Sequence, residues 1–467
     1  MYNFCRGDNM RRNTLRLLAL TLALTMLFIS SGCQRLTDAM DSLVGLYKDI
    51  TVSPQSTTQA PTEPETTVTS YDITDLRYGY YALQTEAQRT LYKKFLEIIR
   101  NISDEKNTDG FYPIDKIEMT EEHLTEGGIR IVIEAFSCDH PEVFWLSNVF
   151  GYFSGNKITM VHLYSLFNNQ EIDSMQKEID VATNDILKTI PDGRGEYERE
   201  KIIHDKIIEH CTYATGVKNS KDNPYAFSIY GALVKHLAVC EGYTKATQYL
   251  LRKVGIQSIS VNGYSKNELH QWCMVSINQN WYHLDTTWDE RQVLNDEDRK
   301  KEVDNILYFY FNTTDSYIEA DHRIAKPFTE LSEEQLCGTD AAKTQIFNLP
   351  LPVCTSEKDT FYNREGALLT NFDSITEYDN IVDKLYKVAK DKKKSFYFKI
   401  GDNLNFNTTV DELFYEKPYQ FFEYTTDVNL LIGNDFNRAY RINDRITMIT
   451  LEAQKIIKIE LDYVKWK

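Results

Sequence analysis

The sequence is poor in cysteine and lacks the cysteine spacings typical of metal sites. Its eight cysteines are spread over 467 residues, and no pair stands in a C-x-x-C arrangement. A cysteine-type zinc site and a disulfide framework are therefore not expected. Leaving aside Cys5, Cys33 and Cys240, five cysteines remain, which are Cys138, Cys211, Cys273, Cys337 and Cys354. Because five is an odd number, at least one of them should be unpaired.

The sequence also lacks an excess of positive charge. Lys and Arg number 52 against 69 Asp and Glu, which gives a formal net charge of −17. Such a chain is poorly suited to the phosphate backbone of nucleic acids, so no nucleic-acid partner is expected. The acidic run Asp296-Glu297-Asp298 lacks the ligand spacing of an EF-hand. No metal or other cofactor is predicted.

The apolar run near the N-terminus is too short for a comfortable membrane span. It covers only residues 17–29, follows a basic head, and leads through small residues to Gly32-Cys33. This order is typical of a secretory signal. The Gly32-Cys33 ending resembles a bacterial lipobox, whose cysteine becomes the lipidated first residue of the mature chain, although Ser30 replaces the usual aliphatic residue. We therefore expect an extracytoplasmic bacterial membrane lipoprotein, with plain secretion or an uncleaved anchor as the alternatives.

Composition and periodicity predict five regions and an α+β fold. Residues 1–32 are the predicted signal peptide, and residues 33–70 combine lipid attachment at Cys33 with a flexible Thr- and Pro-rich tether. An N-terminal α+β region (71–190), a catalytic core (191–330) and a C-terminal α+β accessory domain (345–467) follow. Membrane contact is expected through the N-terminal lipid alone.

The N-terminal region shows clear helix and strand signals. A capping-box pattern, Thr85-x-x-Gln88, precedes an apolar helical stripe. Strands are predicted around residues 129–136 and 157–164. A second helix carries an apolar stripe from residue 172 to residue 190, before Pro191 ends it.

The C-terminal region alternates aromatic and charged residues. The pattern predicts a helix near residues 381–389, a strand at 395–400 and a second strand in the alternating stretch 457–463. Its Tyr and Phe residues fill a core more often than they form a platform for a glycan or peptide.

The most informative feature of the chain is an ordered set of Cys240, His270 and Asp285. Apolar residues at helical spacing follow Cys240 as far as Gly255, which predicts a helix that begins at the cysteine. Free backbone N–H groups and the helix dipole favour a thiolate at such a position, and they can also hold an oxyanion. A thiol, a base and a group that orients the base make a covalent-catalysis site.

His270 and Asp285 are predicted to lie on the two strands of a hairpin. Two alternating runs flank the polar break at residues 278–280, and a turn at Asn278-Gln279 would place Asp285 opposite Trp272 and diagonal to His270. Diagonal neighbours on one face lie about 7–8 Å apart, within reach of a His–Asp hydrogen bond. His283 has the same parity and is a rival base, but the sequence offers it no matched carboxylate.

Several further segments match a known family. They are I-I-H-D-K-I-I (202–208), Y-G-A-L-V, A-V-C-E-G-Y-T-K-A, G-I-Q-S-I-S-V-N-G, H-Q-W, W-Y-H-L-D-T-T-W-D, Y-F-Y-F-N and D-H-R. Together the stretch from Glu196 to Arg323 resembles the transglutaminase-like core domain, a relative of the papain-type cysteine proteases. The resemblance implies Cys240 as nucleophile, His270 as general base and Asp285 as orienting carboxylate.

The resemblance implies an enzyme that acts on amide bonds of proteins or peptides, including cell-wall peptide, through a Cys240 thioester. Hydrolysis of the thioester would make it a peptidase or amidase, which is slightly favoured. Capture by an amine would make it a crosslinking acyl transferase, and a non-catalytic surface scaffold is the third alternative. Trp272, Trp288, Tyr243 and Tyr230 are candidates for the substrate pocket, and Tyr213 and Tyr230 are candidates for a second oxyanion donor.

Lipid attachment at Cys33 has a direct test. Expressed in a bacterium that processes lipoproteins, the protein should partition into detergent, because the free energy falls when an acyl chain leaves water. Cys33→Ala should release the protein into the aqueous phase or leave its signal uncleaved. A mass spectrum with an unlipidated mature N-terminus at another residue would contradict the prediction.

Overall fold

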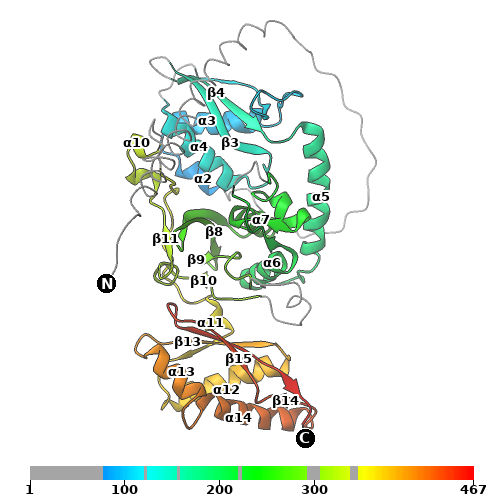
Figure 1. The fold of residues 1–467 in the computed structure, drawn as a ribbon, viewed down its shortest axis with the longest axis vertical. Helices are drawn as coiled ribbons and strands as arrows, with labels where there is room; N and C mark the ends of the chain where they lie inside the picture. The colour runs from blue at the N-terminus through cyan, green and yellow to red at the C-terminus, as the bar shows by residue number, and fades with distance from the viewer. Residues whose placement is uncertain are drawn as a thin grey trace, which may run out of the picture.

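The computed structural model describes residues 77–119, 124–154, 158–218, 223–291, 306–336 and 345–466. The signal peptide, the tether, Cys33, Cys337 and the acidic run at 296–298 were assigned from the sequence and lie outside these ranges. Helices and strands alternate irregularly along the chain, and the α+β class is confirmed (Figure 1).

The N-terminal region packs helices against a small antiparallel sheet at the top of Figure 1. Its described elements are α2 (Tyr78–Ala82), α3 (Glu86–Ile98), β1 (Tyr112–Pro113), β2 (Ile117–Glu118), α4 (Glu126–Asp139), β3 (Leu146–Ser154), β4 (Ile158–Ser165) and α5 (Asn169–Leu187). The predicted capping box is present at the start of α3, where the Thr85 side chain accepts from the Gln88 N–H and the Gln88 side chain accepts from the Thr85 N–H.

The strand predicted at residues 129–136 is wrong, because this segment is part of helix α4. Its apolar residues alternate in places, but Ile129, Val132 and Phe136 also repeat at helical spacing and are fully buried on one face. The Thr125 hydroxyl caps the helix by accepting from the Gly128 N–H. The strand predicted at residues 157–164 is confirmed as β4, and the striped helix is confirmed as α5.

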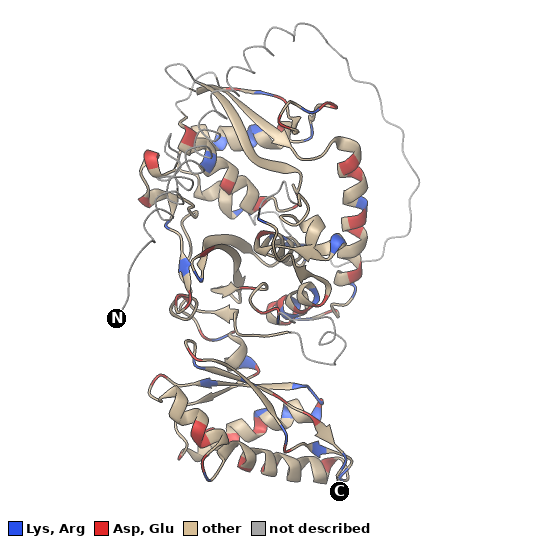
Figure 2. Cartoon of the chain, viewed as in Figure 1, with Lys and Arg blue, Asp and Glu red and all other residues tan. Residues whose placement is uncertain are grey.

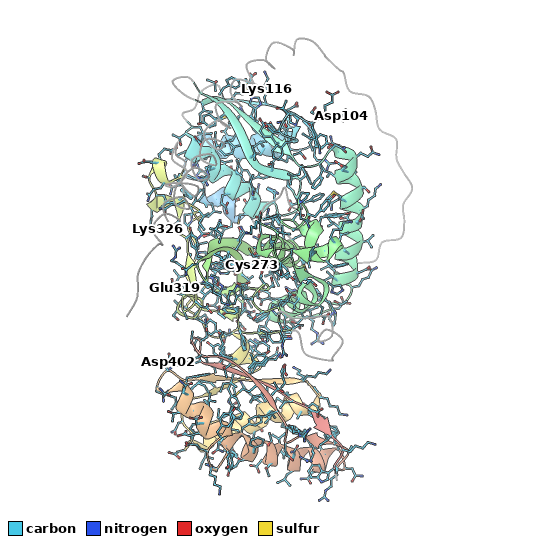
Figure 3. The ribbon with its side chains drawn as sticks, in the orientation of Figure 1. Asp104, Lys116, Cys273, Glu319, Lys326 and Asp402 are labelled. Carbon is cyan, nitrogen blue, oxygen red and sulfur yellow. The ribbon has the colours of Figure 1, made fainter. Side chains whose placement is uncertain are left out.

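The central region contains a helical layer and a five-stranded antiparallel sheet ordered β10-β9-β8-β7-β11. Its described elements are α6 (Glu196–His210), β5 (Thr212–Tyr213), the π-helical turn η1 (Gly231–Lys235), β6 (Leu237–Ala238), α7 (Cys240–Lys253), β7 (Ser258–Ser265), β8 (Glu268–Ile277), β9 (Asn280–Leu284), β10 (Phe311–Thr313), α9 (Asp315–Ile318), β11 (His322–Ile324), η2 (Phe328–Glu330) and α10 (Glu333–Leu336). Cys273, labelled in Figure 3, lies on β8 in the middle of the molecule.

The predicted hairpin register is confirmed in this sheet. Cys273 pairs with Leu284 and Ile277 pairs with Asn280, as a two-residue turn at Asn278-Gln279 requires. Both turn residues have positive φ values, 49° and 67°, which is the conformation of a type I′ turn. Strand β9 ends at Leu284, so Asp285 is the first residue after the end of this strand.

The C-terminal region lies below the central region in Figure 1. Its described elements are α11 (Phe361–Arg364), β12 (Ala367–Leu369), α12 (Ile375–Lys390), β13 (Ser395–Ile400), α13 (Phe406–Phe414), α14 (Gln420–Asp435), β14 (Arg441–Ile442), β15 (Thr447–Leu451), β16 (Ile456–Glu460) and β17 (Tyr463–Val464). The helix predicted near 381–389, the strand at 395–400 and a strand in the stretch 457–463 are confirmed as α12, β13 and β16.

Two hydrophobic cores meet across the C-terminal sheet. Phe396 and Phe398 of β13 pack into a core with helices α12–α14. Tyr397, between them, faces the other way and contacts Tyr308 and Phe361 at ring-centroid distances of 5.9 and 4.9 Å. This second core continues through the central and N-terminal regions. The sheet therefore joins the C-terminal region to the core that holds the predicted site.

Figure 2 shows acidic and basic residues interspersed over the three regions. Within the described ranges no helix is both long and apolar enough to span a bilayer. The free thiols found there are Cys138, Cys211, Cys240, Cys273 and Cys354, so the prediction of at least one unpaired cysteine is confirmed.

Candidate active site

Cys240 is the first residue of helix α7 and the most accessible of these free thiols. The short strand β6 leads into it, and Val239 keeps an extended backbone at the N-cap position. Gly242 allows the first helical turn to pack closely, since an added Cβ would lie 2.4 Å from the Ala226 carbonyl oxygen. Cys240 is partly exposed, whereas the other free thiols are buried.

The structure brings His270 and Asp285 together as the hairpin register predicts. His270 Nε2 lies 2.6 Å from Asp285 Oδ2, and both side chains are buried. The Asp285 Oδ1 atom accepts from the backbone N–H groups of Thr287 and Trp288, at 3.0 and 3.1 Å. The Cys240 thiol is near enough to His270 to contribute to the raised pKa of this histidine. Because Nε2 faces Asp285, Nδ1 is the ring nitrogen left for the sulfur.

Electrostatics favour a charged His270 and a charged Asp285. Burial lowers the pKa of His270, but the charge of Asp285, the hydrogen bond to it and the contact with Cys240 raise that pKa to about 10. Burial works against the Asp285 carboxylate, whereas the charge and hydrogen bonds of His270 and His322 hold its pKa below the ordinary value. The pair is therefore an imidazolium–carboxylate ion pair beside the thiol.

His322 is a site residue that the sequence reasoning did not identify. Its Nε2 lies 3.2 Å from Asp285 Oδ2, and its Nδ1 lies 2.6 Å from Asp321 Oδ1. Burial lowers the pKa of His322, but hydrogen bonds to the two carboxylates reverse the shift and raise it. The D-H-R segment was visible in the sequence, but only the pairing of β11 with β7 brings it to Asp285.

His283, the rival base, is excluded from that role by its contacts. The expectation that it lacks a carboxylate is wrong, because His283 Nε2 lies 3.0 Å from Asp315 Oδ1. Its other nitrogen, Nδ1, accepts a hydrogen bond from the Trp272 indole at 3.0 Å. The side chain is fully buried and both nitrogens are occupied. Of these two histidines, His270 is the one whose pKa is affected by Cys240.

The predicted pocket residues divide into two pairs. The Trp272 and Trp288 rings lie 5.7 and 6.4 Å from the His270 ring, and Trp288 is partly exposed, so it can contact a substrate. Trp272 is 1% exposed and packs behind His270 instead of lining an open pocket. Tyr230 and Tyr243 are buried, and their hydroxyls donate to Glu178 and Glu290. These two tyrosines were assigned to the pocket, but their contacts place them in the core.

Of the two tyrosines considered as oxyanion donors, Tyr213 is the one beside Cys240. Strand β5 pairs Tyr213 with Ala238, two residues before Cys240. Burial together with the nearby charge of Cys240 raises the pKa of Tyr213 to about 12, whereas its contact with the Cys240 backbone N–H acts in the opposite direction. The hydroxyl therefore keeps its proton at neutral pH and can donate it to an oxyanion.

Two groups of side chains in the described ranges converge closely enough to hold a metal ion. They are His270 with Asp285 and His322, and His283 with Asp315 and Cys354. In the first group, the Nε2 atoms of both histidines already face one carboxylate oxygen of Asp285. The two histidines therefore already pair with the carboxylate as they stand.

Comparisons with known proteins point to the same part of the chain. Residues 185–286 match the family model of the transglutaminase-like superfamily, a span that includes Cys240, His270 and Asp285. The central part of the chain is therefore a transglutaminase-like core, as the sequence motifs predicted. The span that matches the family model and the stretch that carries the sequence motifs overlap from Glu196 to Thr286.

The curated relatives are kyphoscoliosis peptidases. The mouse protein (Mus musculus) is 26% identical over 214 residues, which cover 43% of this chain and 30% of the relative. The human protein (Homo sapiens) is 27% identical over 158 residues, covering 31% of this chain and 23% of the relative. The chain thus spans less than a third of the length of either relative.

Two solved structures also align with part of the chain. A TGase crystal structure has a TM-score of 0.23 and 11% identity, and covers 44% of this chain and 58% of its own. A proposed cysteine protease from Cytophaga hutchinsonii has a TM-score of 0.20 and 14% identity, and covers 40% of this chain and 70% of its own. At these scores the family assignment rests on the match of residues 185–286.

The His270–Asp285 ion pair should appear in the pH dependence of stability. The pKa of His270 is about 10 in the folded protein against 6.5 for the ordinary side chain, so its stabilising contribution is complete below about pH 6.5 and is lost as the pH rises towards 10. The free energy of unfolding, measured in urea from pH 6 to pH 10, should fall more steeply for the wild type than for His270→Gln.

His210→Gln, at the exposed end of α6, is the matched control and should follow the wild-type curve. Parallel curves for the wild type and His270→Gln would show that His270 is not held as an imidazolium.

Proposed function

We propose that the protein is a cysteine enzyme that acts on amide bonds of proteins or peptides through a thioester at Cys240. The observation that supports this most directly is the 2.6 Å His270–Asp285 pair, buried beside a partly exposed thiol at a helix N-terminus. A nucleophile, a base and a group that orients the base are the parts that covalent catalysis needs, and these three residues would supply them.

The proposed reaction begins with attack of the Cys240 sulfur on the amide carbonyl carbon. The oxyanion of the tetrahedral intermediate is held by the Cys240 backbone N–H and the Tyr213 hydroxyl. His270 then gives its proton to the leaving nitrogen, the C–N bond breaks, and an amine departs, leaving the acyl group on sulfur. Asp285 keeps the imidazole oriented and stabilises its charged form.

In the second half-reaction, His270 takes a proton from water as the water oxygen attacks the thioester carbonyl. The intermediate collapses with cleavage of the C–S bond, which releases a carboxylic acid and restores the thiolate–imidazolium pair. A primary amine that takes the place of water would give an amide instead, and the enzyme would then be an acyl transferase. Both outcomes share the first half-reaction.

Hydrolysis is the preferred outcome of the two. The thioester partitions between acceptors, and transfer needs a pocket that excludes water and positions an amine. Trp288, whose ring lies 6.4 Å from the His270 ring, is partly exposed, so water reaches this neighbour of the base. The peptidase name of the curated relatives is in line with this preference.

We further propose that the enzyme works outside the cytoplasm, tethered through Cys33, on an envelope protein or a cell-wall peptide. The basis is the short apolar run at residues 17–29 and the Gly32-Cys33 ending. A tether of some tens of residues gives the folded part reach along the membrane surface.

Labelling with an electrophilic peptide analogue tests whether the site is active. The wild type should be labelled at Cys240, and Cys240→Ala should lose labelling and turnover while it keeps its fold. Asp285→Asn should still be labelled but should lose about 10²–10⁴ in kcat/KM, because His270 is no longer held in the productive orientation. Mass spectrometry of labelled peptides and peptide turnover are the measurements.

Cys211→Ala is the matched control for loss of a thiol, because Cys211 is buried and its sulfur faces the Thr212 carbonyl. This variant should be labelled like the wild type. If the folded wild-type protein is not labelled at Cys240, the non-catalytic scaffold replaces the enzyme as the proposed function.

The partition between water and amine can be measured directly. Purified protein is incubated with a library of glutamine-containing peptides and a labelled primary amine, and the products are identified by mass spectrometry. Cleaved or deamidated peptides should exceed labelled ones, because water far outnumbers the amine at an open site. Dominant incorporation of the amine would show that the enzyme is a transferase. Cys240→Ala should give neither product.

A further inference from the structure

The Trp272 indole forms a fixed wall behind the proposed base. Its ring is nearly parallel to the His270 ring, with centroids 5.7 Å apart and an interplanar angle of 18°. On strand β7, Gly263 makes room for it, since an added Cβ would lie 2.7 Å from the indole. The His322 ring contacts it edge-on at 5.2 Å. Trp272 is therefore enclosed, and its position determines the space open to His270.

A chain of hydrogen bonds holds the indole from its far edge. The Trp272 Nε1–H donates to His283 Nδ1 at 3.0 Å, and His283 Nε2 lies 3.0 Å from Asp315 Oδ1. An indole can only donate, so Nδ1 must accept and the proton of a neutral His283 must be on Nε2. Burial lowers the pKa of His283, which favours this neutral form. The tautomer of neutral His283 is therefore fixed by the hydrogen bond that Trp272 donates.

Asp315 is itself clamped to a distant segment of the chain. Its backbone N–H donates to the Cys354 carbonyl at 2.9 Å, and its Oδ2 accepts from the Cys354 N–H at 2.9 Å. The carboxylate therefore has a defined partner on each oxygen. These hydrogen bonds connect the segment around Cys354, through α9 and β9, to the Trp272 ring behind His270.

The alternative use of His283, Asp315 and Cys354 is a metal site, and the hydrogen bonds oppose it. A histidine that binds metal through one nitrogen normally donates the N–H of its other nitrogen to an acceptor. Metal on His283 Nε2 would put a proton on Nδ1, facing the Trp272 N–H at 3.0 Å, donor against donor. The three side chains fit a hydrogen-bond relay better than a metal.

We propose that Trp272, His283 and Asp315 form a second relay that positions the His270 ring for reaction with Cys240. This inference rests on the proposed function. An imidazolium on the face of an indole gains a cation–π interaction, and the parallel stack restricts rotation of the imidazole about its χ2 bond. Rotation of the ring would break its contacts with Asp285 and with the thiol together. His283 and Asp315 are thus positioning residues that act through Trp272.

The test compares variants of the full chain in a cycle. His283→Leu removes the acceptor of the indole proton and should lower both kcat and the rate of Cys240 alkylation by iodoacetamide about tenfold, with little change in KM. Asp315→Asn should lower them less. His283→Asn, which keeps an oxygen near the Nδ1 position, should restore part of the loss. In the Trp272→Phe background there is no indole proton, so His283→Leu should cause no further loss.

Two more measurements separate positioning from a general loss of structure. In protein with ¹⁵N-labelled tryptophan, the indole resonance that disappears in Trp272→Phe should move upfield in His283→Leu, because its hydrogen bond is lost. Tyr282→Phe is the matched control, since it removes a hydrogen bond to Ser356 from the neighbouring residue of β9. It should reduce stability without a change in kcat or in the alkylation rate.

The outcomes distinguish this inference from the proposed function. If wild-type alkylation of Cys240 does not depend on His270, the proposed function fails. If it depends on His270 but His283→Leu and Asp315→Asn react like the wild type, the relay is wrong. Stoichiometric zinc binding by the wild type that Cys354→Ala abolishes would also overturn the relay, in favour of a metal site.

Discussion

The Asp285 carboxylate is the group on which the rest of the site depends. Its Oδ2 faces His270 and His322, and its Oδ1 accepts from two backbone N–H groups of the turn that follows β9. A buried charge is tolerated only when its oxygens are paired, so this carboxylate determines the local fold as well as the protonation of His270. Removing it would leave two buried imidazoles without their common partner.

A second buried network supports the first from the helical side. The Asp289 backbone N–H donates to the Asp285 carbonyl, and one Asp289 oxygen lies 3.1 Å from His204 of α6. The other Asp289 oxygen accepts from the Tyr310 N–H at 2.9 Å. The I-I-H-D segment thus contributes a structural histidine, which joins α6 to the turn that carries Asp285. Polar networks of this kind specify one arrangement because each member needs its partners.

The N-terminal and C-terminal regions are packed against the central region that carries the site. The N-terminal helices and the C-terminal sheet share one continuous hydrophobic core with the central sheet. A shared core couples the regions more tightly than a linker would, so a disturbance at the Tyr397 interface should be felt in the sheet that carries His270. Beside His270, the Trp288 ring is in turn covered by Lys266, whose Nζ lies 4.3 Å from the ring centroid.

The sequence by itself determined the local parts of this site. Period-two alternation and a polar break were enough to predict the β8–β9 register, because a slip of one residue would turn every apolar side chain to the wrong face. Helical spacing after Cys240 likewise predicted the start of α7. The prediction failed at residues 129–136, where both periodicities fit a short run and the packing against α2 and α3 selects the helix.

Contacts between distant segments were decided only by the tertiary structure. His322 reaches Asp285 because β11 pairs with β7, and Asp315 reaches His283 because α9 follows β10 at the edge of the sheet. The same holds for the tyrosines, since β5–β6 pairing brings Tyr213 to Cys240 whereas Tyr230 turns towards α5. Local sequence patterns show which face of a helix or strand is buried and where a helix is capped. The order of strands in a sheet depends on the packing of the whole chain, and this order brought the distant residues of the site together.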